Sequence, residues 1–211
     1  RALEQLGTNK VTRFFGMDNK DKATKTKEDI YKIVIATNEL AKAKTGALIV
    51  IERDIKIKDI VSTGILMDSE ISPQLLVNIF VPKTPLHDGA VVISNNRIAA
   101  AACMLPLASS ADIAKELGTR HRAAIGISKE SDSIAIVVSE ETGKVSVAKD
   151  GTLIADVRED ALKKILINNI VTKRFPENQE RKTNKITRIK AMLKNRKNNN
   201  KQAKEINTDK K

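Results

Sequence analysis

Apolar residues recur at spacings of three and four in two segments of the chain, and this pattern is typical of amphipathic helices. One helix is expected over about 28–44, ending before Gly46, and the last over about 158–173. The polar run 18–29 lacks such a pattern, and we interpret it as a loop. A shorter helix is expected after Ser72, whose side chain can cap it, with a proline as the first helical residue.

Short apolar runs between these helices predict strands. Two pairs of runs are separated by turn-forming residues, Asn95-Asn96 and Thr142-Gly143, and each pair predicts an antiparallel hairpin. The expected strands cover residues 47–51, 64–67, 90–94, 97–104, 134–139 and 144–148. Because helices and strands are interspersed and hairpins are present, the sequence predicts an α/β fold with a mixed parallel and antiparallel sheet surrounded by helices.

Composition places most of the chain in one globular domain. Of 211 residues, 41% are hydrophobic and 30% are charged, while only 2% are aromatic, so stacking platforms for single-stranded nucleic acid are not expected. The net charge is +12, and residues 176–211 carry 12 Lys and Arg against 4 Asp and Glu, a net of +8. We interpret this segment as a solvated tail, with contact to an anionic membrane or nucleic acid as the alternative.

A single cysteine, Cys103, excludes an internal disulfide bond. It lies in an apolar run, which favours a buried and unreactive thiol. No apolar stretch has the roughly 18 residues that a membrane-spanning helix requires, and no signal peptide is recognisable.

The segment His87-Asp88-Gly89 comes directly before an expected strand. A carboxylate there can bind Mg²⁺ or Mn²⁺ or orient an attacking hydroxyl, and a neighbouring imidazole adds a nitrogen ligand. Gly89 would let the backbone approach a ligand closely. The alternative interpretation is an ordinary Asp-Gly turn.

A second segment, Thr119-Arg120-His121-Arg122, follows Gly118 at the expected start of a helix, with Thr119 as the predicted N-cap. The first turn of a helix is electropositive and exposes free N–H groups, so two arginines there are unfavourable unless an anion binds. Bidentate contacts to phosphate would explain them, and a pair of exposed charges is the alternative.

A third segment places Ser139 and Glu141 at the turn of the second hairpin. A serine hydroxyl can donate to phosphate, and a glutamate can complete a metal shell. These residues are also ordinary for a hairpin turn, and on their own they favour that simpler interpretation.

Five segments of the chain carry a combined pattern: TGALIVIER (45–53), PLHDGAVVI (85–93), CMLPLA (103–108), GTRHRAAIG (118–126) and VVSEETG (137–143). Together they strongly resemble the diadenylate cyclase domain, and within that family the membrane-anchored housekeeping cyclase of Gram-positive bacteria. The resemblance covers about residues 28–175 and implies synthesis of cyclic di-AMP from two ATP, with Mn²⁺, Mg²⁺ or Co²⁺. Because that product is two-fold symmetric, a face-to-face homodimer is expected.

The resemblance also implies roles for individual residues. Asp88 is the implied catalytic carboxylate near the ribose 3′-hydroxyl, and His87, Asp88 and Glu141 are the implied metal ligands. Met104 stands where close relatives often have tyrosine, so adenine recognition is expected to differ more than phosphate chemistry. The implied ATP-binding residues are Gly89, Ala90, Met104, Leu105, Thr119, Arg120, His121, Arg122 and Ser139.

Three regions follow from this interpretation: an N-terminal linker after an absent membrane anchor (1–27), the cyclase domain (28–175) and the basic tail (176–211). The full-length protein would then lie at the cytoplasmic face of the bacterial membrane, and this chain would be its soluble catalytic fragment. The rival functions are a nucleotide sensor of the same fold without turnover and a nucleic-acid-binding protein. Specific nucleic acid binding is not expected, because the excess charge lies in the tail.

Overall fold

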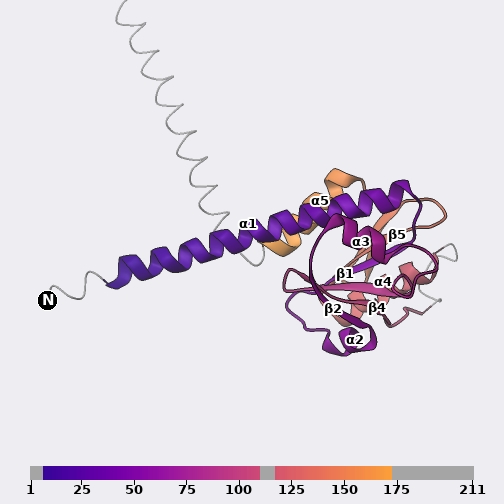
Figure 1. Ribbon diagram of the computed structural model, residues 1–211, viewed down its shortest axis with the longest axis horizontal. Helices are drawn as coiled ribbons and strands as arrows, with labels where there is room; N and C mark the ends of the chain where they lie inside the picture. Colours follow the sequence, from indigo (N-terminus) through magenta and orange to yellow (C-terminus); the bar gives the residue numbers. More distant parts are fainter. Residues whose placement is uncertain (1–6, 110–116, 173–211) are drawn as a thin grey trace, which may run out of the picture.

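The computed structural model describes residues 7–109 and 117–172, which form a mixed sheet with helices on both faces (Figure 1). The strand order is β2-β4-β3-β1-β5-β6-β7. The strands are β1 (Ala47–Ile51), β2 (Ile65–Glu70), β3 (Ala90–Ser94), β4 (Arg97–Cys103), β5 (Ile134–Val138), β6 (Val145–Lys149) and β7 (Thr152–Ile154). The helices are α1 (Gly7–Lys42), α2 (Lys58–Thr63), α3 (Pro73–Ile79), α4 (Thr119–Glu130) and α5 (Glu159–Leu166), and a π-helical turn, η2 (Ile167–Val171), follows α5.

The sheet is mixed, which confirms the predicted fold class. Strand β1 runs parallel to β3 and antiparallel to β5, and the remaining neighbours are antiparallel. Both predicted hairpins are present. In the first, Asn95 and Asn96 have φ of 49° and 63°, the positive values that a tight two-residue hairpin turn needs.

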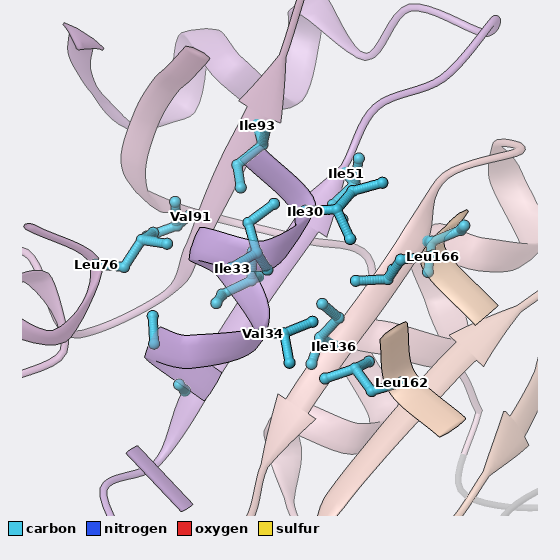
Figure 2. Packing of buried hydrophobic residues seen from close by; sticks show 14 of the residues in the cluster. Ile30, Ile33, Val34, Ile51, Leu76, Val91, Ile93, Ile136, Leu162 and Leu166 are labelled. Atoms are coloured by element: carbon cyan, nitrogen blue, oxygen red, sulfur yellow. The ribbon is translucent and has the colours of Figure 1, made fainter. Parts of the chain in front are cut away.

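Alternation along the central strands divides the core between the two faces of the sheet. Ile49 and Ile51 of β1 face α1, α3 and α5, whereas Leu48 and Val50 face α2 and α4. Figure 2 shows the first face, where isoleucines of α1 pack between the sheet, Leu76 of α3 and the leucines of α5. Because both faces are covered, the central strands are apolar throughout.

The loop predicted over 18–29 is wrong, because α1 continues through this segment as one helix. Its lysines and acidic residues are compatible with a helix, and Ala23, Thr26 and Asp29 are buried along one side. Thr26 and Asp29 accept hydrogen bonds from Asn96 Nδ2 at 3.1 and 3.0 Å, so the β3–β4 turn fixes this part of the helix. The predicted boundary between a linker (1–27) and the domain falls inside α1, and the basic tail lies outside the described residues.

Three other local features of the structure differ from what the sequence analysis expected. Helix α2 and strand β7 were not expected, since both are short and carry no clear periodicity. Thr119 is the first helical residue of α4, and Gly118 is its N-cap, so the predicted capping role of Thr119 is wrong. The predicted cap of α3 is confirmed, because Ser72 Oγ accepts a hydrogen bond from the Leu75 N–H at 3.1 Å.

Candidate functional site

A cavity of about 510 Å³ lies where β1 and β3 begin, β4 ends and α4 begins. This volume is in the range of small-molecule sites. Six of the predicted site residues line it together: Asp88, Gly89, Met104, Leu105, Thr119 and Arg120. The structure therefore brings together segments that lie more than thirty residues apart in the chain.

Gly89 shapes the entry of the chain into β3. Its φ is +119°, and a Cβ atom there would lie 2.8 Å from both the Ala102 carbonyl carbon and the Cys103 oxygen. Only glycine fits this conformation and this close approach to β4. The turn leaves Asp88 exposed at the cavity, while Ala90 is fully buried beneath it in β3.

The segment after β4 forms an apolar wall. Met104 and Leu107 line the cavity and are 74% and 54% exposed, which is unusual for such side chains. The Met104 N–H donates to Thr63 Oγ1 at 2.9 Å, so α2 holds the start of this wall. Exposed apolar side chains around a cavity suit a flat ring such as a base.

The opposite side of the cavity is electropositive. Helix α4 begins at Thr119 without a side-chain cap and without an acidic residue in its first turn. The N–H groups of His121 and Arg122 donate to the Gly118 carbonyl oxygen, which leaves those of Thr119 and Arg120 to bind an anion beside the Arg120 guanidinium. Arg120 Nη1 forms an ion pair with Glu140 Oε2 at 2.8 Å, and Arg120 faces the cavity as well.

The predicted metal ligands are only partly assembled. His87 Nδ1 lies 2.5 Å from the Thr84 carbonyl oxygen, and with the proton on Nδ1 the Nε2 atom is free to bind a cation next to Asp88. Glu141 is exposed at the β5–β6 turn. In the described part of the chain no group of three or more His, Cys, Asp or Glu is placed to hold a metal ion.

A family model for the DisA bacterial checkpoint controller nucleotide-binding domain, DAC, matches residues 34–153. The chain belongs to the DAC family. It is 54% identical over 166 residues to the cyclic di-AMP synthase CdaA of Bacillus subtilis, covering 79% of this chain and 60% of CdaA, so it spans less than two thirds of that relative.

Two solved structures are also similar to this chain. A double cysteine mutant of DacA from Staphylococcus aureus has a TM-score of 0.66 and 47% identity, covering 67% of this chain and 95% of that one. A hypothetical membrane spanning protein from Bacillus cereus has a TM-score of 0.58 and 47% identity, covering 60% of this chain and 62% of that one. In the described residues of this chain, no helix has the length and hydropathy to cross a bilayer.

Ser139, Arg122 and His121, which were also predicted as site residues, do not line the cavity. Ser139 Oγ accepts a hydrogen bond from the Thr142 N–H at 3.3 Å and so helps to form the β5–β6 turn. Arg122 contacts the backbone of Ala108. His121 is half-buried, and this burial lowers its pKa, so the imidazole is neutral at pH 7.

Cys103 lies at the base of the DAC cavity and is buried, as predicted. Burial raises the pKa of its thiol to about 11. The thiolate is therefore scarce at neutral pH, which makes Cys103 a packing residue and not a nucleophile.

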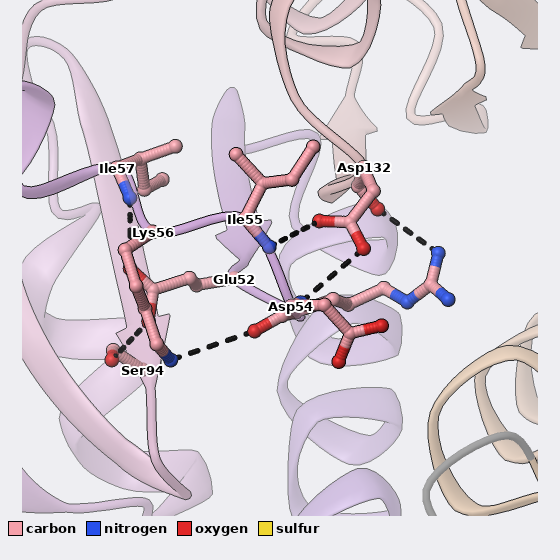
Figure 3. A network of polar contacts seen from close by, with 8 residues as sticks. Glu52, Asp54, Ile55, Lys56, Ile57, Ser94 and Asp132 are labelled. Atoms are coloured by element: carbon pink, nitrogen blue, oxygen red, sulfur yellow. Dashed lines mark hydrogen bonds and ion pairs between the residues drawn. The ribbon is translucent and has the colours of Figure 1, made fainter.

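A buried polar network holds α2 at the other end of β1 (Figure 3). The Glu52 carboxylate accepts hydrogen bonds from Lys56 Nζ (2.8 Å), Ser94 Oγ (2.6 Å) and the Ile57 N–H (3.0 Å). Burial alone would raise the pKa of Glu52, but these bonds together with the Lys56 charge lower it. The network fixes the residues that precede α2, the helix that carries Thr63 to the cavity.

Thr63, Leu48, Leu107 and Glu140 are site residues that sequence reasoning missed. Thr63 and Leu48 have no distinctive pattern around them, since one ends a short helix and the other lies in a uniformly buried strand. Leu107 and Glu140 lie within the segments that carried the resemblance, and their positions in those segments were the available signal.

Proposed function

We propose that the chain is a diadenylate cyclase that condenses two ATP into cyclic di-AMP and releases two pyrophosphates. The observation that carries this proposal is the single cavity shared by Asp88, the Met104–Leu105 wall and the Thr119–Arg120 helix start. These three features offer a carboxylate, an apolar surface and an anion site, as a nucleoside triphosphate requires. The family match and the 54% identity to a cyclic di-AMP synthase support the same activity.

The proposed reaction is an in-line transfer in which the 3′-oxygen of one ATP attacks the α-phosphorus of the other. The O–P bond to pyrophosphate breaks as the new ester bond forms, and the 3′-hydroxyl loses its proton. Asp88 orients this hydroxyl and accepts its proton. Arg120 and the free N–H groups of α4 bind the triphosphate and stabilise the charge that develops on its oxygens.

The base is proposed to pack against Met104, Leu105 and Leu107. Met104 supplies a polarisable side chain where a tyrosine would supply a ring and a hydroxyl. Its backbone N–H is already engaged by Thr63, so recognition at this wall depends mainly on shape and apolar contact.

A divalent cation (Mn²⁺, Mg²⁺ or Co²⁺) fits the donors present, an exposed carboxylate at Asp88 and a free imidazole nitrogen at His87. Such an ion would neutralise phosphate charge and polarise the reacting phosphate. Glu141 stays a proposed ligand, and with these donors alone the remaining coordination sites would fall to phosphate oxygens and water.

Two chains are proposed to face each other across a two-fold axis, because the product contains two equivalent linkages. We also propose that an N-terminal anchor holds the full-length protein at the cytoplasmic face of the membrane. The likeness to the hypothetical membrane spanning protein supports this location. Helix α1, which extends away from the sheet toward the N-terminus, is the proposed connection (Figure 1).

The test is incubation of the chain with ATP and Mn²⁺, followed by mass identification of the product and a pyrophosphate assay. The expected result is cyclic di-AMP with two pyrophosphates per product molecule. A nucleotide sensor of the same fold would instead bind ATP or cyclic di-AMP without turnover. If calorimetry shows ATP binding but no product forms, the sensor is supported and the cyclase is excluded.

A further inference from the structure

Glu140 contacts the cavity only through another residue. Its Oε2 atom lies 2.8 Å from Arg120 Nη1, yet Glu140 is not among the residues that line the cavity, whereas Arg120 is. The Arg120 side chain is 24% exposed and that of Glu140 is 64% exposed. An ion pair this exposed contributes little to fold stability, so its position at the cavity needs another explanation.

Because Gly46 has no side chain, it leaves the space in which the ion pair between Arg120 and Glu140 forms. A Cβ atom at this position would lie 2.6 Å from Arg120 Nη1 and 2.8 Å from Glu140 Oε2. The pairing of Ala47 with Val138 places the start of β1 beside the end of β5, so Gly46 and Glu140 meet at the same sheet end. Three elements, β1, α4 and the β5–β6 turn, thus meet at one guanidinium.

The contact leaves most of the guanidinium unused. A guanidinium carries five N–H donors in a fixed plane. In the described part of the chain, the bond from Nη1 to Glu140 is the side-chain hydrogen bond that Arg120 makes. The remaining donors are therefore free for an anion in the cavity, while the carboxylate restricts how the long side chain rotates.

We propose that Glu140 is a positioning residue that orients Arg120 toward the triphosphate, and that Gly46 is required because a side chain there would displace this pair. The inference rests on the proposed function for the identity of the anion. It assigns to Glu140 a role distinct from that of its neighbour Glu141, which is the proposed metal ligand.

Substitution of Glu140 tests the proposal directly. Glu140→Ala removes the partner of Arg120, and the expected result is weaker ATP binding with unchanged adenosine binding. A shift of the guanidinium by about 1 Å would lower kcat/KM by up to about 100-fold. Glu140→Gln keeps an oxygen that accepts a hydrogen bond from Arg120, so its loss is expected to be smaller than that of the alanine variant.

Asp156→Ala is the matched control. Asp156 forms an exposed ion pair with Lys144 at 3.3 Å and has an exposure similar to that of Glu140, but it does not contact Arg120. The Asp156→Ala substitution removes one negative charge near the β5–β6 turn, as Glu140→Ala does, and is expected to leave ATP affinity unchanged. Equal losses for Glu140→Ala and Asp156→Ala would show a general charge effect and overturn the proposal.

Gly46→Ala provides a test that changes no charge. The atoms that its methyl group would meet are the ends of two flexible side chains, and Gly46 does not have a positive φ, so the fold should be kept. The expected result is a melting temperature near that of the wild type with a loss of ATP affinity like that of Glu140→Ala. Unchanged ATP affinity in a folded Gly46→Ala variant would contradict the proposed displacement.

A double-mutant cycle with Arg120→Ala separates positioning from independent binding. Once Arg120 is absent, Glu140→Ala should cause no further loss of ATP affinity, whereas independent residues would give additive losses. Tighter ATP binding by Glu140→Ala would mean that the carboxylate competes with phosphate, which also overturns the proposal. Because the cycle measures ATP binding, it remains decisive even if the wild type proves to be a sensor without turnover.

Discussion

Arg122 and Ala108 are joined by two hydrogen bonds between α4 and the apolar wall of the cavity. The Ala108 N–H donates to the Arg122 carbonyl oxygen at 3.1 Å, and Arg122 Nε donates to the Ala108 carbonyl oxygen at 3.3 Å. The two arginines at the start of α4 therefore differ. Arg120 faces the cavity, whereas Arg122 holds the segment that carries Leu105 and Leu107.

Arg120→Ala and Arg122→Ala are expected to have different binding signatures. Loss of Arg120 should weaken ATP but not adenosine, because each charge-assisted bond to phosphate contributes about 1.5–3 kcal/mol. Loss of Arg122 should weaken both ligands, because the apolar wall loses the side-chain bond from Arg122 Nε, one of its two bonds to α4. Calorimetric titration with ATP and adenosine measures the difference, and losses confined to ATP for Arg122→Ala would instead show a direct phosphate contact.

Gly126→Ala should damage the same wall from the helix side. A Cβ atom at Gly126 would clash with the Pro106 carbonyl oxygen, a backbone atom that cannot move without shifting the wall. Alanine favours a helix by about 1 kcal/mol over glycine, but overpacking of this kind costs roughly 1–3 kcal/mol. We expect a lower melting temperature together with weaker adenosine binding. Gly118→Ala is the steric control, since its Cβ would contact nothing within 4 Å; alanine at this N-cap lowers helix stability but should leave adenosine binding unchanged.

Asp88→Asn should abolish product formation while the fold is retained. The amide keeps the shape of the side chain but can neither accept the proton of the 3′-hydroxyl nor balance the charge of a cation. Loss of a general base lowers the rate by about 100-fold or more. Turnover and thermal melting should be measured together, and a folded variant with more than about a tenth of the wild-type rate would exclude Asp88 as the catalytic carboxylate.

The sequence predicted those parts of the fold in which local pattern and tertiary packing agree. Both hairpins and the Ser72 cap were predicted, because turn residues and capping side chains act over a few residues. The loop predicted over 18–29 failed because burial there depends on Asn96, which lies about seventy residues away. Packing against a distant turn has no local signature.

Short sequence segments predicted the candidate site. The structure shows which of their residues line the cavity and which bond to the backbone instead. Asp88 and Arg120 line one cavity, as the two segments suggested. Arg122 and Ser139 instead bond to backbone groups of Ala108 and Thr142, and the sequence could not reveal this because it depends on where those loops lie. Glu140 and Glu141 look equivalent in the sequence, and only the position of Gly46 and Arg120 distinguishes them.

His121 should make stability depend on pH near neutrality. Burial lowers its pKa below the ordinary value of about 6.5. Between the two values the unfolded chain binds more protons than the folded one, so stability rises with pH in this window and is lost as pH falls below about 6.5. Thermal melting from pH 7.5 to 5.5 should therefore show a decline that His121→Gln reduces. Identical slopes for both proteins would argue against a neutral, buried imidazole.

Specific activity should rise with enzyme concentration, because one chain supplies one Asp88 and one Arg120, half of what a two-fold symmetric product requires. An isologous dimer brings each 3′-oxygen to the α-phosphate held by the other chain. Each chain would then bind one ATP but not cyclise it alone. Initial rates across a dilution series, with oligomer size followed by light scattering, test this. ATP binding per chain should stay constant while the rate per chain falls on dilution, and constant specific activity from a demonstrably monomeric sample would disprove the face-to-face arrangement.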